Sequence, residues 1–111
     1  MTNVDTLHAQ DSLESYMAVF SALSEPLRIR ILQLIASDQE REYPRSQMDG
    51  ILPVGESTIS YHVAILQRAG LISVRKQGRN YFYRLRKETL TRFVPGFLES
   101  IQEASELAIA G

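Results

Sequence analysis

A cluster of hydroxyl groups occupies one short segment, in which Ser57, Thr58, Ser60 and Tyr61 lie within five residues. Hydroxyl groups can donate hydrogen bonds to phosphate oxygens and to base edges, and they can also accept them. Ser60 is only two residues from His62, but positions i and i+2 of a helix point to different faces, which excludes a nucleophile–base pair. The spacing therefore excludes this catalytic pair, and hydrogen bonding to nucleic acid is one role open to these hydroxyl groups.

These hydroxyl groups need a helix that presents them on one face. Ile59, Val63 and Leu66 recur at the spacing of a buried stripe, which predicts a helix over about residues 56–69. Solvent-facing helix surfaces usually carry Lys and Glu, but here the opposite face carries Ser57, Ser60, Tyr61, Ala64 and Arg68. Short side chains allow close approach to a DNA groove, and the hydroxyls at the helix start lie where a helix N-terminus favours a phosphate. The alternative is a capped helix whose serines only face water.

Charge is distributed unevenly along the chain, and this favours the DNA interpretation. The formal net charge is −1, yet residues 57–87 contain seven of the twelve basic residues and none of the thirteen acidic ones. A charged face that only meets water usually mixes both signs, so this segment predicts one cationic surface on an acidic body. Its basic residues are Arg68, Arg75, Lys76, Arg79, Arg84, Arg86 and Lys87.

A β-hairpin is predicted over about residues 71–86. Val, Ile, Tyr and Phe alternate with polar residues on both sides of a loop at residues 77–80, and the glycine in that loop is typical of a tight turn. Long side chains near its tip can reach the DNA backbone or a minor groove, and the expected contacts are Arg75, Lys76, Gln77 and Arg79. The aromatic residues 81–83 could stack on single strands, but packing is favoured because alternate rings must point inward.

The other elements complete a winged helix-turn-helix fold. A flexible tail over residues 1–10 precedes helices at about 11–24 and 24–37, a polar connector, a weak helix at about 45–52, and, after the hairpin, a helix at about 95–110. Two helices joined by a short turn containing glycine form a helix-turn-helix, and the hairpin that follows is the wing. The predicted fold is therefore mostly α with a β-hairpin (α+β), in one domain over residues 11–111.

Three segments, in this order, resemble the ArsR/SmtB family of bacterial winged-helix regulators. They are AVFSALSEPLRIRILQLI at residues 18–35, STISYHVAILQRAGLI at 57–72 and VRKQGRNYFYRL at 74–85. The resemblance implies a homodimer that binds a two-fold operator in double-stranded DNA, with the first and last helices as the dimer interface. It also implies contacts to DNA from Glu56, Ser57, Ser60, Tyr61 and, in the wing, Arg79.

An apolar stripe on the last helix agrees with a dimer, because in a monomer of this size it would leave a sizeable exposed patch. The residues predicted for the dimer interface are Leu13, Met17, Phe20, Phe97, Leu98, Ile101, Ala104 and Ala108.

Candidate metal sites are few, and neither a metal nor another cofactor is expected. The chain has no cysteine, which excludes thiolate sites and disulfides, and the sensor cysteines of metal-responsive family members have no counterpart. His8 could only pair with Asp5 or Asp11, which is a poor set for a transition metal. Glu99, Glu103 and Glu106 could attract a hard cation, although a solvated face is favoured. His62 is expected to be a packed or hydrogen-bonded structural imidazole.

The function predicted from the sequence is sequence-specific binding of double-stranded DNA by a transcriptional regulator, expected to be a repressor of ArsR type. The alternatives are an activator, or a winged-helix module that binds only proteins. No catalytic motif indicates an enzyme, and no apolar run is long enough to span a membrane. We expect a cytoplasmic, nucleoid-associated protein whose inducing ligand or partner the sequence does not name.

Overall fold

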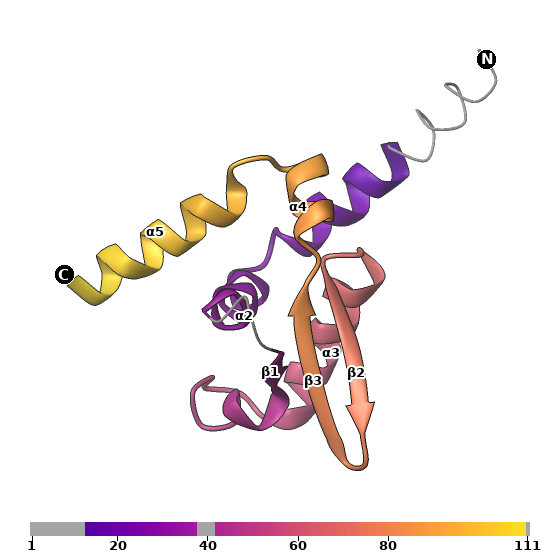
Figure 1. Ribbon diagram of the computed structural model, residues 1–111, viewed down its shortest axis with the longest axis vertical. Helices are drawn as coiled ribbons and strands as arrows, with labels where there is room; N and C mark the ends of the chain where they lie inside the picture. The colour runs from indigo at the N-terminus through magenta and orange to yellow at the C-terminus, as the bar shows by residue number, and fades with distance from the viewer. Residues whose placement is uncertain (1–12, 38–41, 111) are drawn as a thin grey trace.

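The computed structural model describes residues 13–37 and 42–110, the last six of these by their backbone. The predicted tail over residues 1–10 lies outside the described residues. The chain forms a helix over residues 13–22, followed by α2 (Pro26–Ala36), β1 (Tyr43–Pro44), the 3-10 helix η1 (Arg45–Gln47), α3 (Glu56–Arg68), β2 (Ile72–Gln77), β3 (Asn80–Leu85), α4 (Lys87–Phe93) and α5 (Phe97–Ala110) (Figure 1).

The recognition-helix candidate α3 begins and ends close to where the sequence predicts. Gly55 is its N-cap, and Gly70 adopts a left-handed conformation with φ 79° just beyond its end. The backbone N–H of Leu71 donates to the Leu66 carbonyl and that of Gly70 to the Gln67 carbonyl, both at 3.0 Å, which is the Schellman pattern. In α2, Glu25 holds the N-cap position, and the Ser24 hydroxyl donates to the Ser21 carbonyl at 2.6 Å.

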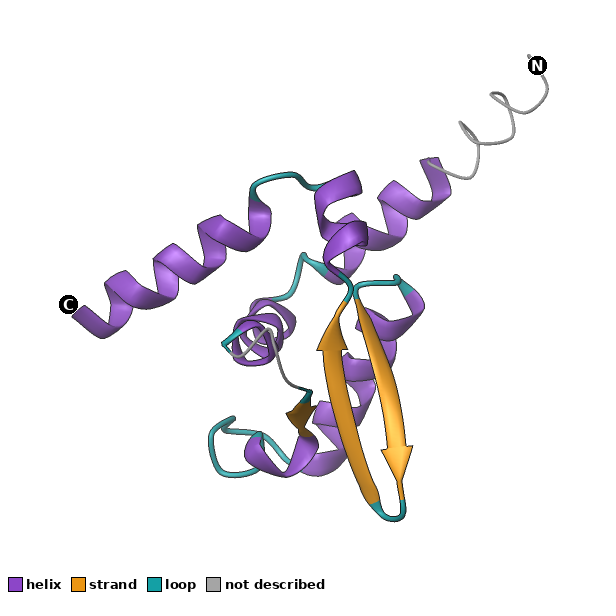
Figure 2. Ribbon diagram, viewed as in Figure 1, coloured by secondary structure: helices purple, strands orange, loops and turns teal. Residues whose placement is uncertain are grey.

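The predicted hairpin is present, but it belongs to a three-stranded antiparallel sheet in the order β1-β3-β2 (Figure 2). Strands β2 and β3 pair from Ile72 opposite Leu85 to Gln77 opposite Asn80, and Gly78, with φ 62°, opens the two-residue turn. Strand β1 replaces part of the predicted polar connector, because Tyr43 pairs with Tyr83. A two-residue strand has no alternation of its own, so only its distant partner makes it a strand.

One helical prediction needs correction, and one helix was not predicted. The weak helix predicted at about residues 45–52 shortens to η1, since Gly50 has φ 87° and the chain turns there. The helix predicted at about residues 95–110 is confirmed as α5, and it is preceded by a short helix, α4, that the sequence analysis did not predict.

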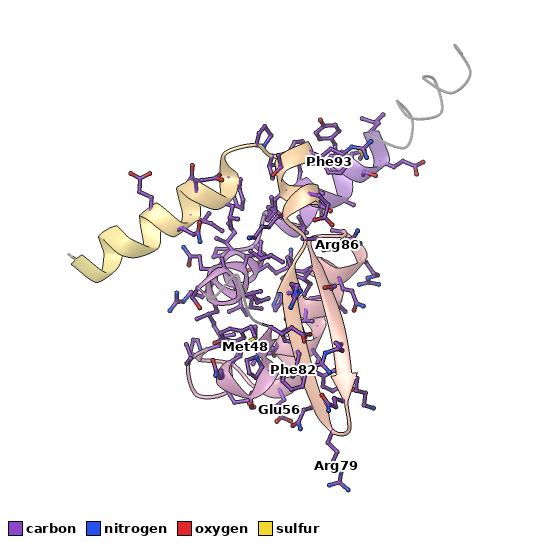
Figure 3. The ribbon with its side chains drawn as sticks, in the orientation of Figure 1. Met48, Glu56, Arg79, Phe82, Arg86 and Phe93 are labelled. Carbon is purple, nitrogen blue, oxygen red and sulfur yellow. The ribbon has the colours of Figure 1, made fainter. Side chains whose placement is uncertain are left out.

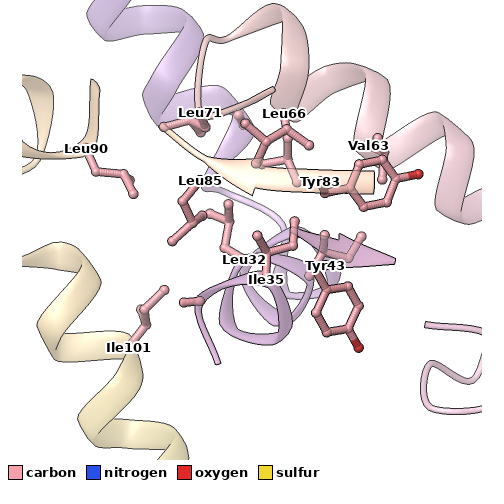
Figure 4. Packing of buried hydrophobic residues seen from close by; sticks show 14 of the residues in the cluster. Leu32, Ile35, Tyr43, Val63, Leu66, Leu71, Tyr83, Leu85, Leu90 and Ile101 are labelled. Carbon is pink, nitrogen blue, oxygen red and sulfur yellow. The ribbon is translucent and has the colours of Figure 1, made fainter. Parts of the chain in front are cut away.

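The hydrophobic core lies between α2, α3, the sheet and α5 (Figure 4). The predicted stripe of α3 is confirmed, because Ile59, Val63 and Leu66 are all buried there. Strand β3 contributes Tyr83 and Leu85 to the same core. Burial of this stripe leaves the opposite face of α3 to solvent.

The terminal helices lie at the end of the molecule away from the wing tip (Figure 1). Leu98 and Ile101 of α5 are only 8% exposed and pack within the protomer, where the Gln33 amide also donates to the Ile101 carbonyl at 2.9 Å. Their predicted place in an exposed stripe is therefore wrong, because α5 lays this face on α2. Phe97 is half-buried and Ala104 is exposed, while the side chain of Ala108 lies outside the described residues.

Candidate nucleic-acid interface

A shallow groove with a volume of about 810 Å³ lies between the start of α3 and the wing tip. Figure 3 shows Glu56 and Arg79 at this same end of the molecule, with Arg79 extending from the tip. The hairpin and the hydroxyl-bearing helix therefore share one surface. Its lining residues are Pro44, Arg45, Ser46, Asp49, Glu56, Ser57, Ser60, Arg79, Asn80, Tyr81 and Phe82.

The outer face of α3 has the predicted orientation. Ser57 and Ser60 are exposed, and Tyr61 is 62% exposed although it is a large aromatic residue. Thr58 is half-buried, so it contributes less surface than its neighbours. Arg68 is exposed at the far end of α3 and does not line the groove.

Arg45 is a groove residue that the sequence reasoning missed. Its Nη2 donates to the Glu56 carbonyl at 2.7 Å and to the Ser60 hydroxyl at 3.0 Å, and its Nη1 donates to the Tyr83 hydroxyl at 3.4 Å. One side chain thus joins η1, α3 and β3. Its partners lie 11 to 38 residues further along the chain, so no local pattern could have indicated this role.

The basic residues of the wing differ in their surroundings. Arg75 was predicted at the tip, but it lies opposite Phe82, its Nε donates to both Glu42 carboxylate oxygens at 2.9 and 3.0 Å, and its Nη1 donates to Gln77 at 2.8 Å. Its guanidinium also lies 4.6 Å from the centre of the Phe82 ring. The placement of Arg75 at the tip is therefore wrong, and this ion pair offsets its charge.

Arg79 and Lys76 lie near the tip of the hairpin, as the sequence predicts. Arg79 is exposed in the turn after Gly78, and the ammonium of Lys76 lies 5.6 Å from the centre of the Tyr81 ring. At the other end of the hairpin Arg86 pairs with Glu88 at 3.2 Å. A hydrogen bond from the backbone N–H of Glu88 itself, and to a smaller extent the contact with Arg86, lower the pKa of that carboxyl group.

Tyr83 is buried in the core beneath the groove, where its hydroxyl accepts a hydrogen bond from Arg45. Its ring is 1% exposed, and burial raises the pKa of its phenol, against the smaller opposing effect of Arg45. The phenol therefore stays neutral at physiological pH and does not offset the charge of Arg45. Two carboxyl groups, those of Asp49 and Glu56, are the negative members of the lining.

His62 is hydrogen-bonded within the protein. Arg28 Nη1 lies 2.9 Å from His62 Nδ1, so the guanidinium donates and this ring nitrogen accepts. The same guanidinium donates to the carbonyls of Ala22 at 2.7 Å and Ser21 at 3.2 Å. Desolvation and the nearby Arg28 charge lower the pKa of His62, while Glu25 raises it. The prediction of a structural imidazole is confirmed.

Comparison with known proteins assigns the family. The family model for a helix-turn-helix domain matches residues 23–75. The HTH-type transcriptional regulator YceK of Bacillus subtilis (strain 168) is 31% identical over 83 residues, which cover 75% of this chain and 82% of that protein. A transcriptional repressor SmtB homolog of Synechocystis sp. (strain ATCC 27184 / PCC 6803 / Kazusa) is 27% identical, over 85% of this chain and 69% of that protein. This chain belongs to the ArsR/SmtB family of helix-turn-helix transcriptional regulators.

A solved structure agrees with this assignment. An ArsR-like transcriptional regulator from Rhodococcus sp. RHA1 has a TM-score of 0.65 and 28% sequence identity to this ArsR/SmtB-family chain, covering 90% of this chain and 91% of that one. The five helices and the hairpin wing described above are those of an ArsR-like winged helix.

Metal ligands are sparse in the described part of this ArsR/SmtB-family protein. Among the described side chains, at residues 13–37 and 42–104, no three of His, Asp or Glu gather into a group that could hold a metal ion. His8, Asp5, Asp11 and the side chain of Glu106 lie outside the described residues, so the candidate sites that include them stay predictions. No described helix is long and apolar enough to span a membrane.

Proposed function

We propose that this protein is a homodimeric repressor that binds a two-fold operator in double-stranded DNA. Each protomer places the start of α3 in a major groove, and its wing tip meets the adjacent backbone or minor groove. The observation that carries the proposal is the groove shared by Ser57 and Ser60 on α3 and by Arg79 on the wing. A relative named as a repressor, the SmtB homolog, supports repression over activation.

An exposed apolar stripe supports the dimer. Leu13, Met17 and Phe20 lie at positions i, i+4 and i+7 of the first helix, and they are 64%, 64% and 55% exposed. These spacings place the three side chains on one helix face, where a second copy would remove them from water. The other exposed large apolar residues of the described chain lie elsewhere in the fold, at Ile51, Tyr61 and Tyr81.

Footprinting of genomic DNA with the purified protein tests the proposed function. We expect protection of a site with two related half-sites, and a reporter placed behind that site should be expressed less when the protein is present. Expression that rises instead would identify an activator. Absence of protection on all fragments would favour a module that binds only proteins.

Substitution of the wing-tip arginine tests the assigned surface. Arg79→Ala should weaken binding about tenfold on all sequences, because Arg79 meets the backbone, and should reduce the steepness of the salt dependence by about one. Fluorescence anisotropy over a series of salt concentrations measures both quantities. The matched control is Arg86→Ala, since Arg86 lies at the opposite end of the hairpin and pairs with Glu88 (Figure 3). Equal effects of the two substitutions would contradict the assignment of the tip.

A further inference from the structure

The Ser60 hydroxyl is engaged from one side only. A serine hydroxyl has one proton to donate and two lone pairs that accept, whereas an arginine side chain can only donate. Arg45 Nη2, at 3.0 Å, therefore occupies one lone pair of Ser60 Oγ. The hydroxyl proton of Ser60 takes no part in this contact. Because Ser60 is exposed and lines the groove, its proton can be directed outward.

Arg45 also occupies the acceptor within the helix that Ser60 would otherwise use. A serine in a helix commonly donates to the carbonyl four residues earlier, as Ser100 does to Gly96 at 2.9 Å. For Ser60 that carbonyl belongs to Glu56, and Arg45 Nη2 already donates to it at 2.7 Å. The guanidinium thus holds both the hydroxyl oxygen and the carbonyl oxygen, which turns Ser60 into a donor toward the groove.

The positive charge of Arg45 further favours Ser60 as a hydrogen-bond donor over Ser60 as an acceptor. Among the described side chains, at residues 13–37 and 42–104, no carboxylate forms an ion pair with Arg45, whereas Arg75 and Arg86 each pair with one. Its Nε is buried without a hydrogen-bond partner, and Tyr83 beside it is neutral. A cation next to Ser60 Oγ disfavours the approach of a further donor, such as the amino group of a base.

We propose that Arg45 is a positioning residue for sequence recognition: it holds the Ser60 hydroxyl as a hydrogen-bond donor, so that Ser60 selects against cytosine in the operator. This rests on the proposed function, in which α3 enters the major groove. Adenine, guanine and thymine each present an acceptor in the major groove, whereas cytosine presents its N4 amino donor. A serine held as a donor can therefore bond to three of the four bases at the position that it faces, and the cation beside its oxygen disfavours the amino group of the fourth.

Selection from a randomised DNA library, followed by sequencing, tests this pairing. The wild-type protein should show one position in each half-site where cytosine is disfavoured about tenfold. Ser60→Ala and Arg45→Met should each make that position permissive and leave the other positions unchanged, and the double variant should show no further change. Arg30→Met is the matched control, because Arg30 is exposed on α2 and does not line the groove.

The outcomes of this selection distinguish a failure of the Arg45–Ser60 inference from a failure of the proposed function. If the wild-type protein selects no operator at all, the proposed function itself fails. If an operator is selected but Ser60→Ala keeps the bias against cytosine, Ser60 does not read that position and the inference is wrong. It is equally wrong if a folded Arg45→Met protein, verified by its circular dichroism and melting transition, binds all sequences more weakly with an unchanged base preference.

Discussion

Single residues give the groove charges of both signs. In the proposed complex with DNA, Arg45 and Arg79 attract phosphates, while Asp49 and Glu56 oppose them. A carboxylate that faces DNA also accepts a hydrogen bond from the cytosine amino group, so it can contribute selectivity where it lowers general affinity. The lining therefore favours discrimination between sequences over tight binding to any DNA.

Replacement of the carboxylate at the start of α3 should separate these two contributions. Glu56→Gln should tighten binding to unrelated DNA about fivefold at low salt, because it removes one repulsion worth about 1 kcal/mol at contact distance in water. It should also lower the free energy of unfolding by about 0.5 kcal/mol, since an acidic residue in the first turn of a helix interacts favourably with the helix dipole. Anisotropy titrations and urea unfolding measure the two effects.

Asp49→Asn provides the matched control. Asp49 lines the same groove but precedes α3, so its substitution should tighten DNA binding and leave helix stability unchanged. Weaker binding of Glu56→Gln to every sequence would show that this carboxylate makes a favourable contact instead.

The outward face of α3 was predictable because helical periodicity is local: burying Ile59 and Val63 exposes Ser60 and Tyr61. The roles of Arg45 and Arg75 were not predictable in the same way. Each depends on partners brought close by the fold, Ser60 for Arg45 and Glu42 for Arg75. A basic residue in a sequence gives no sign of whether a carboxylate will neutralise it.

One buried arginine, Arg28, connects three helices: the first helix, α2 and α3. Arg28 of α2 donates to carbonyls at the end of the first helix and to His62 of α3. The first helix carries the proposed dimer stripe and α3 carries the proposed DNA face, so Arg28 joins the two functional elements. The contact requires His62 Nδ1 to be unprotonated, because a protonated ring has no acceptor.

Acid should therefore weaken the hydrogen bond between Arg28 and His62 and lower the stability of the folded protein. The pKa of His62 is lowered in the folded protein, so the folded state binds fewer protons than the unfolded chain once the pH falls below about 6.5. The free energy of unfolding should decrease with falling pH from that point down through the pKa of the folded state. His62→Asn, whose amide oxygen can accept from Arg28 without titrating, should lose less stability between pH 7.5 and 5.5. Urea unfolding at several pH values measures the difference.

The chain contains one other histidine, and this provides a control. His8→Asn should keep the wild-type dependence of stability on pH. If His62→Asn also kept the full wild-type dependence, His62 would not be the source of the loss of stability in acid.

Elements with strong local patterns were predicted, and elements created by tertiary contacts were not. The helices α2 and α3 and the hairpin follow from hydrophobic periodicity and turn glycines. Strand β1 exists only because Tyr43 pairs with Tyr83, forty residues along the chain. The helix α4 is too short for a distinct periodic stripe, and it is stabilised by packing, including an edge-to-face contact of Phe93 with Tyr16 at 4.7 Å.

The whole molecule separates two surfaces. The groove and the wing tip lie at one end, and the helix that carries Leu13, Met17 and Phe20 lies toward the other (Figure 1). The sequence indicated an apolar face on both terminal helices, but it could not show which face would turn inward. In the structure α5 uses Leu98 and Ile101 for the protomer core, so among the described side chains of the two terminal helices the exposed large apolar residues all lie on the first helix.

A charge placed in the centre of that stripe should separate the protomers. Met17→Glu should raise the dimer dissociation constant on the order of a hundredfold, because each protomer loses about 1.5 kcal/mol of apolar burial at the interface. Folding of the protomer should change little, since Met17 is 64% exposed. Sedimentation equilibrium gives the dissociation constant, and affinity for a complete two-fold operator should fall much more than affinity for a single half-site.

The matched control for oligomeric state is Ile51→Glu, which places the same charge on another apolar side chain that is 51% exposed but lies outside the first helix. This variant should remain as dimeric as the wild type, because Ile51 lies outside the proposed interface. A general effect of charge on solubility would instead appear at both positions. A Met17→Glu protein that stayed dimeric would move the interface away from the first helix. The symmetric operator would then need another pair of contacting faces, and the exposed stripe would require a different partner.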